Sequence, residues 1–241
     1  AARNVYHRLR YDLSKSKTSV SSTTATSETG EEGKSLRGSS VAYTLSKDSR
    51  DSRFDPTEGY FLELDETVSG LGGDVKFLRT KLSAAYYKPL LFKSVIVGLS
   101  GEVGHISGLG DKVTQSKRFY LGGEKIRGFD GVGIGPRDVG SGDSVGGNTM
   151  YSGRVEVVSS LGLNKDTGVR WTVFSDFGSL WGTDYPTNVT EADANDIRAS
   201  LGLGFYWATA IGPLSFSWAN PISKMDHDKT RTFQFNIGTR L

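Results

Sequence analysis

Arg127 lies in a glycine-rich stretch, and two strand-like segments further along the chain carry one carboxylate each, Glu156 and Asp176. A guanidinium group can hold two carboxylates at once through directed, charge-assisted hydrogen bonds. A carboxylate on the inner side of a sheet is costly when it is dry and unpaired, and it becomes tolerable when it meets a cation. These three residues therefore predict an ionic latch that ties a loop to two neighbouring strands.

A second interpretation stays open from the residues alone. Arg127 would then be an ordinary loop cation, and both carboxylates would pair with arginines of the strands. The candidate arginines are Arg154, Arg170 and Arg198. In the latch interpretation, glycines beside Arg127, such as Gly128, let the backbone fold back sharply. Phe129 would then pack against an inward-facing aromatic residue such as Phe174.

The other residues that could do chemistry form no recognisable site. The chain has no cysteine, which excludes disulfides, thiolate metal ligands and a cysteine nucleophile. Its histidines are scattered without the spacing of metal ligands: His7, His105 and His227. The run 131–136 lacks the third glycine of a dinucleotide-binding loop, and no paired catalytic carboxylates stand out. We expect no enzyme activity, no cofactor and no metal site.

The elements that must position the latch are β-strands, because apolar residues recur at every second position almost throughout the chain. About ten segments alternate in this way, and most approach the roughly 9–11 residues that cross a bilayer at a tilt. In each segment one face is apolar and the other carries the charges. By this parity Glu156 and Asp176 lie on the charged faces of neighbouring strands.

The lengths of the connections separate two all-β architectures. A soluble β-sandwich also alternates, but it points its apolar faces at a second sheet. Here long and short connections alternate, as in outer-membrane barrels; the longest spans 104–148, and the brief 69–74 is the exception. The 31 glycines, 12 phenylalanines and 10 tyrosines suit a curved sheet with aromatic girdles. We predict an antiparallel transmembrane β-barrel with the loop 104–148 folded into its lumen.

Charge and hydropathy fit this architecture. The net charge of +2 gives no argument for nucleic-acid binding. No apolar run approaches the roughly 18 residues of a membrane helix. The negative mean hydropathy is expected when half of each strand faces a polar lumen.

Several motifs resemble, in order along the chain, those of the BamA family of outer-membrane β-barrel assembly factors. The stretch 120–123 together with Ile126-Arg127-Gly128-Phe129 resembles the signature of the loop that plugs the family's barrel. Phe174-Ser175-Asp176-Phe177-Gly178 resembles the family's Phe-x-Asp-x-Gly strand, whose aspartate meets the loop arginine. Glu156 stands where the second partner of that arginine lies. Further segments resemble an inner turn, the turn before the penultimate strand and the closing strand: 51–59, 211–214 and 233–238.

The resemblance implies a barrel of sixteen strands preceded by periplasmic POTRA modules. We therefore expect residues 1–241 to be a single partial domain, about ten C-terminal strands of such a barrel without a POTRA module. The first and last strands of the family pair weakly, so that the seam between them opens toward lipid and accepts a nascent strand. The latch would stiffen the wall opposite this seam. The residues expected to form the closing strand are Phe233, Phe235, Ile237 and Gly238.

The implied function is the insertion and folding of β-barrel proteins in the bacterial outer membrane. The implied partners are nascent outer-membrane β-barrel proteins, outer-membrane lipid, and periplasmic or lipoprotein assembly partners of the full protein. Three alternatives remain. A two-partner secretion pore or TamA-like factor shares the loop motif, a passive porin would conduct solutes steadily through an open lumen, and a soluble β-sandwich binder would dissolve without detergent.

Overall fold

The computed structural model describes residues 4–17, 35–53, 55–90, 94–160, 168–184, 188–190, 196–209 and 212–237. Within this part of the chain, ten antiparallel strands form one sheet, and strands that follow one another in sequence lie side by side. In sheet order they are β1 (Val5–Lys17), β2 (Ser35–Asp48), β3 (Gly59–Ser69), β4 (Phe77–Pro89), β5 (Val95–Gly108), β7 (Thr149–Ser159), β8 (Val169–Trp181), β9 (Arg198–Thr209), β10 (Gly212–Ser223) and β12 (Phe233–Ile237). The remaining elements are the short strands β6 (Gly128–Phe129) and β11 (Thr230–Arg231) and the 3-10 helix η1 (Gln115–Lys117).

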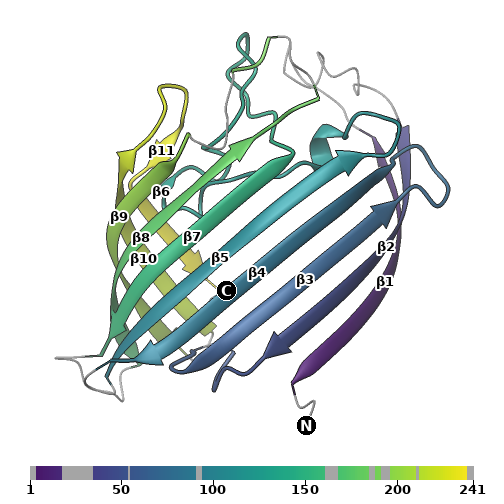
Figure 1. Ribbon diagram of the computed structural model, residues 1–241. Helices are drawn as coiled ribbons and strands as arrows, with labels where there is room; N and C mark the ends of the chain where they lie inside the picture. Colours follow the sequence, from purple (N-terminus) through teal and green to yellow (C-terminus); the bar gives the residue numbers. More distant parts are fainter. Residues whose placement is uncertain are drawn as a thin grey trace.

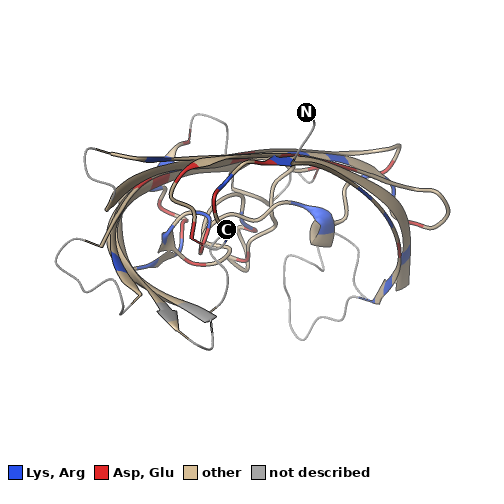
Figure 2. Cartoon of the chain, turned by 90° about the horizontal axis from the view of Figure 1, so that it is seen from below, with Lys and Arg blue, Asp and Glu red and all other residues tan. Residues whose placement is uncertain are grey.

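The sheet is a strongly curved wall with tilted strands (Figure 1). Seen from below, it forms an arc whose concave side holds loop segments (Figure 2). The edge strands of this wall, β1 and β12, do not pair with each other in the described residues. The expected antiparallel barrel strands are confirmed, and they form an open part of a barrel wall. No helix in the described residues is long and apolar enough to cross a membrane.

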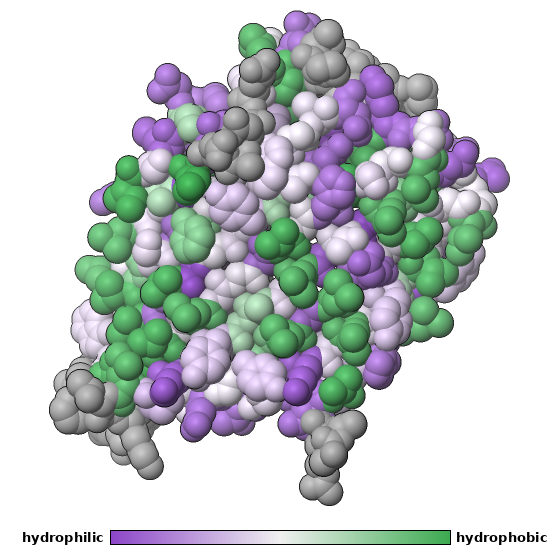
Figure 3. All heavy atoms as spheres, in the orientation of Figure 1, coloured by the Kyte–Doolittle hydropathy of each residue, from purple (hydrophilic) through white to green (hydrophobic). Residues whose placement is uncertain are grey.

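The convex face of the wall carries the apolar side chains of the period-two pattern. On β8 and β9 these include Trp171, Val173 and Leu201, which are exposed. On the same strands, Asp176 and Arg198 point to the concave side and are fully buried. Figure 3 shows apolar side chains spread over the outer face between more hydrophilic rims. No second sheet covers this face in the part of the chain described, so the β-sandwich alternative is wrong.

The connections alternate between the two rims of the wall, as predicted from their lengths. One rim carries the connections 70–76, 109–148 and 224–232 and the described parts of 182–197. The other rim carries the described parts of 49–58, 90–94 and 160–168. The short link between β3 and β4 therefore lies on the long-loop rim.

The connection 109–148, named the plug loop here, folds against the concave side of the wall (Figures 1 and 2). The predicted start of this loop at residue 104 is wrong, because β5 keeps pairing with β4 up to the register partners Gly108 and Phe77. Gly104 has a packing role in this strand, since a Cβ atom there would lie 2.6 Å from the ring of Phe119. The glycines at this end of β5 admit the plug loop to the wall.

The apolar core lies between the plug loop and the upper inner surface of the wall. Its members from the loop are Val113, Phe119, Leu121, Ile126, Phe129 and Ile134, and its members from the wall side are Val75, Phe77, Ile106, Met150 and Leu180. All of them are buried. The plug loop therefore serves as the second layer against which a curved sheet buries its inner apolar residues.

Candidate functional site

A sharp reversal of the plug loop carries Arg127 to the wall. Gly122, Gly123 and Gly128 have φ angles of 129°, 58° and 92°, in the region that glycine adopts without a steric penalty. Gly128 also lies against the wall itself, since a Cβ atom there would be 3.2 Å from the Cβ of Ser200 and 3.4 Å from that of Ala219. Gly128 thus has the positive φ angle that a sharp reversal next to Arg127 requires.

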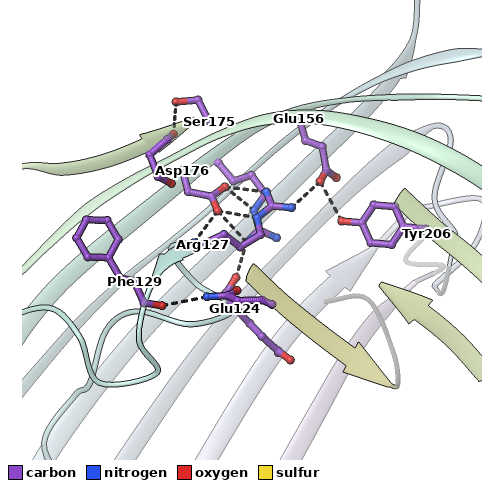
Figure 4. A network of polar contacts seen from close by, with 10 residues as sticks. Glu124, Arg127, Phe129, Glu156, Ser175, Asp176 and Tyr206 are labelled. Atoms are coloured by element: carbon purple, nitrogen blue, oxygen red, sulfur yellow. Dashed lines mark hydrogen bonds and ion pairs between the residues drawn. The ribbon is translucent and has the colours of Figure 1, made fainter. Parts of the chain in front are cut away.

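The latch contacts are present (Figure 4). The guanidinium of Arg127 donates to Asp176 through Nε at 2.8 Å and Nη2 at 2.9 Å, and the backbone N–H of Arg127 donates to the same carboxylate at 3.0 Å. Its Nη1 donates to Oε2 of Glu156 at 3.2 Å. All three side chains are buried, with exposures of 5% for Arg127, 4% for Glu156 and 0% for Asp176. Adjacent strands β7 and β8 supply the two carboxylates.

The alternative pairing with strand arginines is also realised at one position. Arg154 donates to Oδ1 of Asp176 at 2.8 Å and to the backbone carbonyl of Glu124 in the plug loop. The other two candidates pair elsewhere: Arg170 lies 2.6 Å from Asp55, and Arg198 lies 3.0 Å from Asp228. Asp176 therefore pairs with two guanidinium groups. That of Arg127 belongs to the plug loop, and that of Arg154 also donates to the loop.

Tyr206 completes the network, and the sequence analysis did not identify it. Its hydroxyl donates to Oε2 of Glu156 at 3.0 Å from strand β9 (Figure 4). The alternation along β9 could have indicated it, because Tyr206 and Arg198 are an even number of positions apart and therefore lie on the same face of the strand. Burial alone would lower the pKa of Arg127, but the hydrogen bonds and charge of Asp176, with the charge of Glu156, outweigh burial and raise that pKa above its ordinary value. Arg127 is therefore a permanent cation inside the wall.

Aromatic packing in the site differs from the prediction. The guanidinium carbon of Arg127 lies 3.2 Å from the centroid of the Phe174 ring, a cation–π contact. Phe129 is instead part of the apolar core between loop and wall, to which Phe174 does not belong. The predicted contact between Phe129 and Phe174 is wrong, because Arg127 occupies the face of that ring. Gly178 lets Ile126 approach the wall, since a Cβ atom at Gly178 would lie 2.8 Å from Cδ1 of Ile126.

The comparisons with known proteins agree with this geometry. A family model described as the Omp85 superfamily domain matches residues 2–241. The chain belongs to the Omp85 superfamily. This family consists of β-barrel proteins of outer membranes, so the apolar convex face of the Omp85 domain faces lipid.

Relatives of this Omp85 domain occur in bacteria and in eukaryotes. It is 34% identical over 200 residues to the outer membrane protein assembly factor BamA of Neorickettsia risticii, which covers 83% of this chain and 27% of the relative. It is 31% identical over 224 residues to the human sorting and assembly machinery component 50 homolog, covering 88% of this chain and 47% of the relative. The chain thus spans about a quarter of the length of this bacterial relative.

A solved structure resembles the whole wall. The crystal structure of BamA from Haemophilus ducreyi lacking POTRA domains 1-3 superposes with a TM-score of 0.83 at 24% identity. The match covers 98% of this chain and 51% of that chain. At this level of identity the similarity establishes the fold alone.

The closing strand β12 has the predicted faces. Phe233, Phe235 and Ile237 point outward and are exposed, and β12 pairs with β10 from Phe233 to Ile237. Gly238 lies outside the described residues. The expectation that the latch stiffens the wall opposite the seam is wrong, because only β9 and β10 separate the latch strands from β12 in the sheet.

Proposed function

We propose that this Omp85 domain is the C-terminal part of the barrel of an assembly factor that inserts and folds β-barrel proteins in the bacterial outer membrane. The observation that carries the proposal is the latch, in which a neutral set of ion pairs, buried except at Arg154, fixes a long loop inside the wall. The names of the relatives support it, since these are assembly factors in bacteria and a sorting and assembly machinery component in animals.

The edge strand β12 supplies the chemistry of this function, which is backbone hydrogen bonding rather than catalysis. Within the described residues β12 pairs with β10 on one side and has no strand partner on the other. The unpaired N–H and C=O groups of such an edge can accept another strand. In the full barrel, nascent outer-membrane β-barrel proteins would add their strands at this seam.

The plug loop favours assembly over passive conduction. It packs a continuous apolar core onto the inside of the wall, whereas a porin requires a water-filled lumen. The apolar convex face would contact outer-membrane lipid. Periplasmic or lipoprotein assembly partners would dock on other parts of the full protein.

Reconstitution of the full-length protein in lipid vesicles tests the proposal. An unfolded outer-membrane β-barrel client is added, and the folded client is measured over time by its resistance to unfolding in cold detergent. We expect faster folding than in empty vesicles and a large loss of this acceleration in Arg127→Ala. Equal folding rates in empty and loaded vesicles would refute the assembly function.

Two further readouts separate the alternatives. Release of a soluble passenger protein across the vesicle wall would indicate a secretion pore, and steady conductance in a planar bilayer would indicate a porin. We expect neither, because the plug loop occupies the lumen.

A further inference from the structure

The plug loop has a second set of contacts, on the seam side of the wall. Strand β6 of the loop pairs antiparallel with β11, in the register Phe129 with Thr230 and Gly128 with Arg231. The pairing continues beyond these residues, because the N–H of Asp130 donates to the carbonyl of Lys229 at 2.9 Å. The segment that leads from β10 into β12 is therefore a strand partner of the loop segment that carries Arg127.

The closing strand itself also holds the loop. Gln234 is buried, and its Nε2 donates to the backbone carbonyl of Phe129 at 2.9 Å. Two residues further along, the side-chain amide of Asn236, oriented with its NH2 group toward the loop, donates to Oε1 of Glu124 at 3.0 Å. These are successive lumen-facing positions of β12. Each contributes a hydrogen bond to the plug loop.

A buried ion pair orients the segment before β12. Arg198 of β9 lies 3.0 Å from Asp228, and neither side chain is accessible to solvent. Asp228 also accepts a hydrogen bond from the backbone N–H of Met225 at 2.8 Å, which closes the turn. An ion pair at 2.6 Å between Arg231 and Asp130 joins the turn to the loop at its accessible end. One ion pair thus joins the wall to the turn, and the other joins the turn to the loop.

We propose that these contacts form a seam anchorage, through which the position of the plug loop and the pairing of the closing strand control each other. The seam anchorage comprises Gln234, Asn236, the β6–β11 pair and the ion pairs Arg198–Asp228 and Arg231–Asp130. Displacing β12 breaks the bonds of Gln234 and Asn236 to the loop, so a displaced closing strand leaves the loop held by the latch and by the contacts of the turn, which are the β6–β11 pair and the ion pair Arg231–Asp130. The coupling is structural, and its value for inserting client strands rests on the proposed function.

Hydrogen–deuterium exchange on the full-length protein in lipid nanodiscs tests the coupling without reading activity. In the double variant Gln234→Ala with Asn236→Ala, we expect the amides of 128–134 and 229–231 to exchange about 5- to 10-fold faster, as the loss of one or two hydrogen bonds predicts. The matched control is Ser215→Ala, because Ser215 is the register partner of Asn236 on β10. Wild-type exchange of the loop in the double variant overturns the proposal.

The reverse experiment changes a residue of the plug loop. Asp130→Ala removes a partly exposed carboxylate, the ion-pair partner of Arg231, and this change is compatible with folding even if the double variant does not fold. Because coupling between two sites is mutual, it should accelerate exchange at 233–237 as well as at 128–134. Acceleration confined to the loop would also overturn the proposal. Since no client is present, either result is independent of whether the protein assembles other barrels.

Discussion

The plug loop is held at two places that differ in their physical chemistry. At the latch, buried guanidinium and carboxylate groups meet on β7 and β8, near the middle of the described sheet. At the seam anchorage, the contacts to the loop are backbone pairs, two side-chain amides and one accessible ion pair, in which the side chain of Arg231 is 61% exposed. The buried ion pair Arg198–Asp228 joins β9 to the turn before β12. The loop itself is held there by the weaker bonds just named.

This difference assigns different roles to the two places. Removing one partner of a buried ion pair leaves an uncompensated charge and costs about 3–5 kcal/mol. A single hydrogen bond between uncharged groups contributes about 0.5–1.5 kcal/mol. The latch is therefore suited to permanent attachment, and the seam anchorage to attachment that can be released and formed again. The following substitutions test this contrast.

The largest effect is expected for Arg127→Ala, which leaves Asp176 with Arg154 alone and Glu156 with Tyr206. The free energy of unfolding, measured by urea titration in lipid vesicles, should fall by about 3–5 kcal/mol. Lys117→Ala, which removes another cation of the same loop, is the control. Combining Arg127→Glu with Asp176→Arg should restore only part of the loss, because the introduced arginine would face Arg154. Wild-type stability of Arg127→Ala would remove the latch from this account.

Arg154→Ala should have an intermediate effect, because Arg127 continues to neutralise Asp176. We expect the free energy of unfolding to fall by about 1.5–3 kcal/mol, the range for hydrogen bonds to charged groups. Arg170→Ala is the matched control, since its partner Asp55 has a side chain that is 50% exposed and surface ion pairs contribute about 0–1 kcal/mol. Equal losses in the two variants would contradict the importance of burial in the latch.

Tyr206→Phe removes one hydroxyl and nothing else from the network. The hydrogen bond to Glu156 is lost while the ring stays in place, so we expect a loss of about 1.5 kcal/mol, the low end of the range for hydrogen bonds to charged groups. The measurement is the same urea titration. In the background of Glu156→Gln the effect of Tyr206→Phe should shrink, because a charged acceptor gives the stronger bond. An unchanged effect in that background would show that the hydroxyl acts elsewhere.

Arg231→Ala should change global stability least, by no more than about 1 kcal/mol, because its ion pair is accessible. Its effect should vanish near 1 M salt, where the screening length is about 3 Å. The effect of Arg127→Ala should persist at the same salt concentration, since solvent does not reach the latch. Comparing the two variants at low and high salt would therefore separate the two anchorages, and equal salt dependence would abolish the distinction.

The period-two pattern was sufficient to predict which way most side chains point. It placed Glu156 and Asp176 on the inner face and Phe233, Phe235 and Ile237 on the outer face, because successive residues of a strand alternate between the two sides. The glycine next to Arg127 also indicated the sharp reversal, since few other residues adopt its backbone conformation. These features depend on local geometry, which neighbouring residues in the chain determine.

The partners across the lumen were decided by tertiary structure alone. Gln234 binds the carbonyl of a residue 105 positions earlier in the chain, and no local pattern contains that contact. Parity allowed Arg154 and Tyr206 to face the site, but only the stagger of β7, β8 and β9 brings them to the carboxylates. The sequence by itself determined the faces of the strands and the charges on them. The folded wall decided which of those charges and amides meet, because curvature and register set distances that alternation leaves open.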